Sequence, residues 1–130
     1  MRLGAMMKAP AIHIFTHDSI YVGEDGPTHQ PIEQLFSLRA VPNLFVYRPA
    51  DAKETAAVFR QLLTVRYREG PSILALTRQN VPTLEHSYAE IEKGVFKGAY
   101  ILFENKLSPK ILIAATGSEV HLALEVAKKL

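Results

Sequence analysis

The chain has 130 residues, about the size of one domain, and its 48% hydrophobic and 22% charged residues are an ordinary globular balance. Its 15 Lys and Arg residues are scattered and nearly matched by 13 Asp and Glu, so the composition favours neither nucleic acid nor a membrane surface as a partner. The absence of Cys excludes disulfides and thiolate metal sites, and no apolar run approaches the ~20 residues of a membrane span.

Strand and helix patterns alternate through residues 1–80. Residues 1–8 resemble the end of a helix without an N-terminal cap, as if the chain began part-way through it. Short apolar runs that are typical of buried parallel strands follow, at 11–15, 44–47 and 72–76. Helical periodicity lies between them, at 31–39 and 52–67. Asp51 and Glu54 resemble a capping box at the start of the second helix. This alternation predicts an α/β fold, with a three-layer α/β/α parallel sheet.

The remainder of the chain predicts a linker and the start of a second α/β domain. Residues 81–97 are polar and contain Pro82 and Gly94, so we predict an irregular linker there. Residues 98–130 contain two further strand-like runs, at 100–103 and 111–115, and then a helix whose expected N-cap is Ser118.

Residues 16–31 connect the first predicted strand to the following helix and read T-H-D-S-I-Y-V-G-E-D-G-P-T-H-Q-P. Turn formation explains the two glycines and the proline, but not the gathering of two histidines and three carboxylates. These are His17, His29, Asp18, Glu24 and Asp25. Loops at the ends of parallel strands commonly hold functional residues, so we predict a site here; a solvated charged loop is the alternative.

Four side chains in or near this region suit proton transfer and the binding of hydroxyl groups or phosphate. His29 can donate or accept a proton near neutral pH, and Asp25 can accept a hydrogen bond from a hydroxyl. His17 and Arg78 each follow a predicted strand, so a parallel sheet would bring both to one edge, where they could bind phosphate. Each role has a structural alternative. His29 could cap a neighbouring backbone group, Asp25 could stabilise its own turn, and Arg78 could form a salt bridge with Asp18 or Glu24.

The loop sequence resembles that of the transketolases. The resemblance continues through S-L-R-A-V-P-N-L, R-P-A-D-A-K-E-T, T-R-Q-N-V-P-T-L and the stretch from K-G-A-Y to A-T-G-S-E-V. It implies a cytoplasmic transferase of carbohydrate metabolism, in the pentose phosphate pathway. Such enzymes move a two-carbon ketol unit from a ketose phosphate to an aldose phosphate with thiamine diphosphate and Mg²⁺ or Ca²⁺. They are homodimers whose active sites lie at the subunit interface.

The resemblance also implies roles for individual residues. His29 would be catalytic at the donor's first hydroxyls, and Asp25 would read the acceptor's second hydroxyl. His17 and Arg78 would grip the sugar phosphate. We assign no residue to the cofactor and none to a metal, because no G-D-G motif with its asparagine occurs and the activating glutamate is expected upstream.

The chain would thus be part of a transketolase: the second half of a pyrimidine-binding domain at 1–80, a linker at 81–97, and the start of the C-terminal domain at 98–130. We expect it to be inactive alone. Two alternatives remain open. A deoxyxylulose-phosphate synthase shares the cofactor and a D-G-x-T-H loop, although T-H-D-S-I and E-D-G-P-T-H-Q-P favour transketolase. The other is a non-catalytic interaction chain derived from the same fold.

Overall fold

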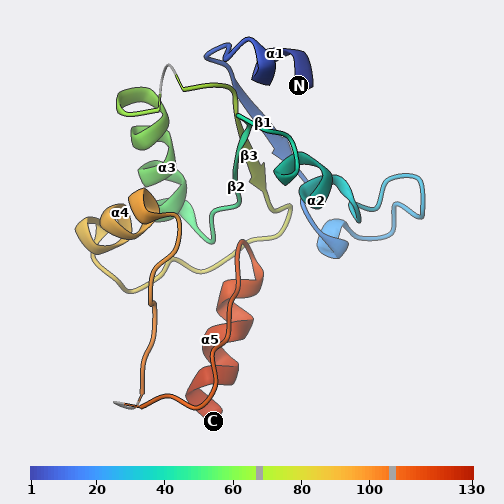
Figure 1. Cartoon of the computed structure of the whole chain (residues 1–130). Helices are drawn as coiled ribbons and strands as arrows, with labels where there is room; N and C mark the ends of the chain where they lie inside the picture. The colour runs from blue at the N-terminus through green and yellow to red at the C-terminus, as the bar shows by residue number, and fades with distance from the viewer. Residues whose placement is uncertain (67–68, 106–107) are drawn as a thin grey trace.

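The computed structural model of the chain describes residues 1–66, 69–105 and 108–130 (Figure 1). Its elements, in order, are α1 (Arg2–Met6), β1 (Ile12–Thr16), the 3-10 helix η1 (Ile20–Val22), α2 (Gln34–Arg39), β2 (Phe45–Tyr47), α3 (Ala52–Thr64), β3 (Ser72–Leu76), α4 (Tyr88–Lys97) and α5 (Glu119–Lys129).

The three strands form one parallel sheet in the order β1-β3-β2. In the register, Ile12 pairs with Ser72 and Thr16 with Leu76, while Tyr47 of β2 pairs with Leu74. The predicted strands therefore exist within one residue of their expected bounds, and their carboxyl ends lie at one edge. This confirms the prediction of neighbouring parallel strands.

Side chains alternate between the two faces of β3, and each face carries its own apolar cluster. Ile73 packs with Ala5 of α1 and Leu44, and Leu38 of α2 adjoins this cluster. Leu74 packs on the opposite face, against α3. Helices therefore cover both faces of the sheet, which confirms the predicted three-layer α/β/α arrangement.

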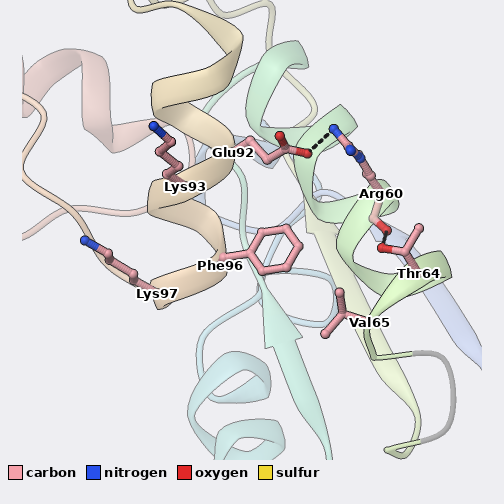
Figure 2. Close-up of a pocket in the computed structure, with 7 residues that line it drawn as sticks. All are labelled: Arg60, Thr64, Val65, Glu92, Lys93, Phe96 and Lys97. Atoms are coloured by element: carbon pink, nitrogen blue, oxygen red, sulfur yellow. Dashed lines mark hydrogen bonds and ion pairs between the residues drawn. The ribbon is translucent and has the colours of Figure 1, made fainter.

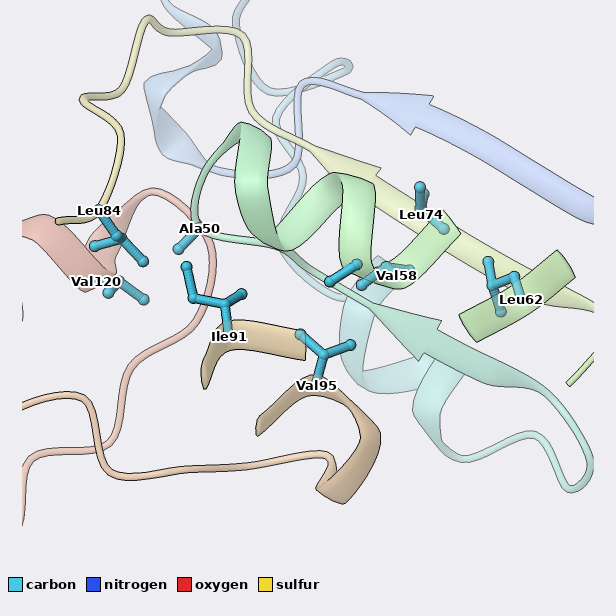
Figure 3. Close-up of a cluster of buried hydrophobic side chains, with 9 residues drawn as sticks. Ala50, Val58, Leu62, Leu74, Leu84, Ile91, Val95 and Val120 are labelled. Atoms are coloured by element: carbon cyan, nitrogen blue, oxygen red, sulfur yellow. The ribbon is translucent and has the colours of Figure 1, made fainter. Parts of the chain in front are cut away.

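The cluster around Leu74 extends well beyond the sheet, as Figure 3 shows. It joins α3 to α4 and to the start of α5. Its buried members are Ala50, Ala57, Val58, Leu62, Leu74, Leu84, Ile91, Val95 and Val120. The C-terminal part of the chain thus shares a core with the sheet layer.

Helix α3 begins as predicted, with Asp51 as its N-cap: Asp51 Oδ1 accepts a hydrogen bond from the backbone N–H of Glu54 at 2.8 Å. Glu54 does not complete a capping box, because its carboxylate accepts from the backbone N–H of Ala50 instead. The helix ends at Thr64, and the predicted end at Tyr67 lies outside the described residues. Helix α2 begins at Gln34, three residues later than predicted.

The prediction that 81–97 is irregular was wrong, because its second half is helix α4. Ser87 and Glu90 form a capping box at the start of this helix. Gly94 made the segment look irregular, but it has a packing role: a Cβ there would lie 2.3 Å from the Tyr100 ring. Tyr100 in turn donates a hydrogen bond to Glu54 at 2.5 Å. A residue with no side chain therefore lets the chain after α4 pack against that helix.

The two strands predicted for a second domain, at 100–103 and 111–115, are also absent at those residues. An isolated extended run becomes a strand only when a neighbour completes its hydrogen-bond ladder, and neither segment pairs with a described residue. Helix α5 does follow, as expected. Ser118 precedes it, but its hydroxyl bonds the Glu119 carboxylate rather than capping the backbone. The domain bounds stay a prediction.

Candidate functional site

The site begins at the edge of the sheet where the strands end. His17 directly follows β1, Arg48 directly follows β2, and Arg78 lies two residues after β3. Because Thr16 pairs with Leu76, the chain leaves β1 and β3 at the same edge. The prediction that His17 and Arg78 share an edge is confirmed; their roles in binding remain predictions.

His17 ends its strand sharply. Its backbone has a φ of 67°, a left-handed conformation that is uncommon outside glycine although histidine is among the residues enriched in it. The exposed imidazole is held at Nδ1 by a hydrogen bond of 2.8 Å to the Thr16 hydroxyl. This turn directs the chain away from the sheet into residues 17–31, which we call the site loop.

Short internal bonds shape the site loop. The Ser19 hydroxyl accepts from the backbone N–H of Tyr21 at 3.3 Å and caps η1. The Gln30 side chain donates to the Gly23 carbonyl at 2.8 Å, across seven residues. Ser19 and Gln30 therefore hold the shape of the loop through bonds to its own backbone.

Asp25 and His29 are both exposed. The site loop that carries them extends from the end of β1 beside α2 (Figure 1). A hydrogen bond of 2.8 Å to the Thr28 hydroxyl orients His29 through Nδ1. No hydrogen bond within the described part of the chain joins any two of the four predicted site side chains. The structure therefore places His17 and Arg78 at one edge, and Asp25 and His29 on the exposed loop that continues from His17.

The charged centre of this region is Arg48, a residue that the sequence analysis missed. Its Nε donates to Asp18 Oδ2 at 2.5 Å, and its Nη1 donates to the Thr116 carbonyl at 2.9 Å and to the Glu119 carboxylate. Asp18, considered above as a partner for Arg78, pairs with Arg48 instead. Arg78 is exposed and forms no ion pair with a described residue.

This network shifts the pKa of two of its members. Burial of the Arg48 guanidinium lowers its pKa, but hydrogen bonds to Glu119 and Asp18 outweigh that effect, so the pKa lies above its usual value. Burial raises the pKa of Glu119, but the bonds from Arg48 and Ser118 outweigh it and leave the pKa below its usual value. Both groups are therefore held in their charged forms at neutral pH.

Replacement of Glu119 by Gln should make the free energy of unfolding less dependent on pH under acidic conditions. Because the Glu119 pKa is lower in the folded chain, its contribution is present above the unfolded value of about 4.3 and is lost as the pH falls through the folded value. The variant lacks this contribution, so its unfolding free energy should fall less steeply below about pH 5. Urea unfolding at several pH values would measure this. Glu125→Gln, an exposed change on the same helix, should leave the slope unchanged; equal slopes for both variants would contradict the prediction.

The described part of the chain has a surface hollow beside the Arg48 network and another between two helices. One, of about 300 Å³, adjoins the network; its lining residues are Asp18, Ser19, Ile20, Tyr21, Pro31, Leu35, Arg48 and Glu119. The other, of about 550 Å³, lies between α3 and α4, where Figure 2 shows Phe96 and Val65 with the Arg60–Glu92 ion pair above them. It includes the end of α3, which leads back to the start of β3, so it lies towards the opposite edge of the sheet. We assign it no role in the site.

The described residues contain no group of three or more His, Cys, Asp or Glu side chains that could hold a metal ion. None of the helices in the described part of the chain has the length and apolar character needed to cross a membrane.

Comparisons with known proteins match one family over the three strands and the site loop. The family described as "Transketolase, pyrimidine binding domain" matches residues 1–83. The chain is 52% identical to a transketolase of Bacillus subtilis over 131 aligned positions and 53% identical to one of Geobacillus stearothermophilus. Each match covers 100% of this chain and 19% of the relative, so the chain spans about a fifth of the length of these relatives.

Solved structures show the same similarity. A transketolase from Leishmania mexicana superposes with a TM-score of 0.90 at 43% identity, over 99% of this chain and 18% of that one. A Pichia stipitis transketolase in complex with sedoheptulose 7-phosphate superposes with a TM-score of 0.85 at 47% identity, over 98% and 18% of the two chains.

Proposed function

Because this chain belongs to the transketolase family, we propose that it supplies substrate-binding residues for ketol transfer from a ketose phosphate to an aldose phosphate. The observation that carries the proposal is the strand-end loop of β1, with His17 and Arg78 at one sheet edge, in a chain about half identical to transketolases. The Pichia stipitis relative was solved with sedoheptulose 7-phosphate and, in another structure, with xylulose 5-phosphate. Sugar phosphates are thus the proposed substrates here as well.

His17 and Arg78 are the proposed phosphate ligands. Arg78 is exposed at the carboxyl end of β3 and is not engaged in an ion pair within the described ranges, so its planar fork of donors is available to phosphate oxygens. The exposed His17 imidazole adds a donor at the same edge, held in orientation by Thr16. Two donors from neighbouring strands suit one anionic group.

His29 and Asp25 are the proposed ligands of substrate hydroxyls. His29 is held at Nδ1 by Thr28, which leaves Nε2 to donate or accept a proton at a donor-sugar hydroxyl. Asp25 is an exposed carboxylate that can accept a hydrogen bond from an acceptor hydroxyl. Both residues follow His17 on the site loop, so the proposed hydroxyl ligands and one proposed phosphate ligand belong to the same connection.

The pyrimidine-binding domain implies thiamine diphosphate, which would supply the carbanion-stabilising chemistry when bound. The described residues contain no group of three or more His, Cys, Asp or Glu side chains for its metal ion, Mg²⁺ or Ca²⁺, so no residue of this chain is assigned to the cofactor. A homodimer with the active site between subunits, a cytoplasmic location and a place in the pentose phosphate pathway complete the proposal. Neither a deoxyxylulose-phosphate synthase nor a non-catalytic chain is favoured, since the matched relatives are transketolases.

The proposal is tested by replacing Arg78 with Ala in an enzyme of full family length that carries this segment. Loss of a charge-assisted hydrogen bond costs about 1.5–3 kcal/mol, so kcat/KM for a phosphorylated donor should fall about 10- to 150-fold. The unphosphorylated donor hydroxypyruvate should be spared. A coupled assay with xylulose 5-phosphate and hydroxypyruvate measures both values.

The matched control is Arg2→Ala, which removes an exposed arginine from α1, near the opposite edge of the sheet. It should leave both donors unaffected. An equal loss for both donors in the Arg78 variant would show that Arg78 is structural, and no ketol transfer by the parent enzyme would overturn the proposed function itself.

A further inference from the structure

We propose that Arg48 is the positioning residue of the site loop, and that the first turn of α5 holds Arg48 in place. The inference rests on the proposed function of the loop as the carrier of His17, Asp25 and His29. It adds a contribution from residues 116–119, which lie beyond the part of the chain that matches the pyrimidine-binding family.

The site loop has one side-chain ion pair to a described residue distant in sequence. Its other hydrogen bonds are internal or join it to the adjoining Thr16; the backbone donors Val22, His29 and Gln30, for example, bond to Ser19 and Gly26. The exception is Asp18, which accepts from Arg48 thirty residues further along the chain. Since Asp18 directly follows His17, this one ion pair fixes the point where the loop leaves the sheet.

The link is buried and uses the particular shape of arginine. The side chains of Asp18 and Arg48 are 1% and 9% exposed, so solvent screens their attraction little. Arg48 uses Nε for Asp18, and Nη1 for Thr116 in the turn before α5 and for Glu119 at the start of that helix. A lysine ammonium keeps the charge but lacks a rigid fork with two separate donor nitrogens. Charge alone therefore cannot reproduce the bridge.

The turn before α5 is fitted around Arg48. The backbone N–H of Gly117 donates to the Arg48 carbonyl at 3.0 Å, so backbone and side chain of Arg48 both bind this turn. Gly117 has a φ of 65°, and a Cβ there would lie 2.7 Å from Arg48 Cζ. Only glycine leaves the guanidinium room to reach Asp18 and Glu119 together.

Loss of this bridge should affect the loop as a whole. His17 would be released directly, and Asp25 and His29 would lose the anchor of the loop that carries them. The kcat/KM should therefore fall for unphosphorylated as well as phosphorylated donors, whereas loss of Arg78 is expected to spare the unphosphorylated donor.

The test uses Arg48→Lys and Glu119→Gln in an enzyme of full family length that carries this segment. Hydrogen exchange, followed by mass spectrometry without substrate, would report on the backbone amides of 17–31. In Arg48→Lys, exchange of the loop's internally bonded amides should become about tenfold faster, the change expected for loss of one charge-assisted hydrogen bond. The kcat/KM should fall about 10- to 100-fold for both donor types. Glu119→Gln keeps the Asp18 pair and should give smaller changes in the same direction.

Glu125→Gln, which like Glu119→Gln lies on α5, should change neither the hydrogen exchange of the loop nor kcat/KM. Unchanged loop exchange in both Arg48→Lys and Glu119→Gln would overturn the inference, as would faster loop exchange with undiminished kcat/KM in an active parent enzyme. If Arg48→Lys does not fold, Glu119→Gln alone decides. An inactive parent enzyme with a loop loosened by these changes would refute the proposed function while leaving the positioning role of Arg48 supported.

Discussion

Replacement of His29 by Ala is expected to lower kcat/KM for ketol transfer about 10²- to 10⁴-fold, the usual contribution of a group that moves a proton in the transition state. The side chain is exposed on the site loop, and its bond to the Thr28 hydroxyl fixes the ring. Alanine removes the proton donor without disturbing a buried contact. Steady-state kinetics of an enzyme of full family length that carries this segment would measure the loss, which should be similar for phosphorylated and unphosphorylated donors.

Two further variants make this result specific. Thr28→Ala keeps the imidazole but removes its partner at Nδ1, so it should cause a smaller loss. His86→Ala removes a half-buried histidine that lies in the connection before α4 and forms no described hydrogen bond to the site loop, so it should have no effect on kcat/KM. A tenfold loss of kcat/KM corresponds to ~1.4 kcal/mol of transition-state stabilisation. If the His29 variant retained more than about a third of the parent kcat/KM, the loss would be smaller than this, and His29 would have no role in proton transfer.

The sheet could be predicted from sequence because each strand is a short apolar run between turn residues. Residues 81–115 could not be predicted in the same way, for two physical reasons. Helix α4 contains Gly94, a residue that normally disfavours helix. Its packing against Tyr100 explains its presence, but this contact cannot be read from the sequence around Gly94. The runs at 100–103 and 111–115 have strand-like composition, but a strand also requires a neighbour, and composition does not supply one.

The candidate site was predictable where it depends on the chain order of strands and loops. His17 and Arg78 follow strands that pair in parallel, so their common edge follows from the α/β alternation. Arg48 was missed because its partners Asp18 and Glu119 lie 30 and 71 residues away in sequence. A signal did exist: Arg48 follows a predicted strand directly, in the same relation to β2 that His17 has to β1.

Replacement of Leu74 by Ala should reduce the free energy of unfolding by about 2–5 kcal/mol, the range for a buried leucine truncated in a packed core. Leu74 is 0% exposed and lies on the central strand β3, in register with Ile14 on one side and Tyr47 on the other. It belongs to the cluster that joins α3, α4 and the start of α5 (Figure 3). The truncation therefore opens a cavity in the core, and α3, α4 and α5 would all have to shift to fill it. Urea denaturation of the chain, followed by circular dichroism, would measure the change.

Leu63→Ala is the matched control, because it removes the same atoms from α3 at a side chain that is 60% exposed. A surface truncation of this kind should change the free energy of unfolding by no more than about 0.5 kcal/mol. The urea curves also show whether the cluster around Leu74 unfolds as one unit. If it does, the contacts between α3 and α4 and the sheet should be lost together in a single transition. Equal destabilisation by the two variants would mean that Leu74 is not at the centre of the core described here.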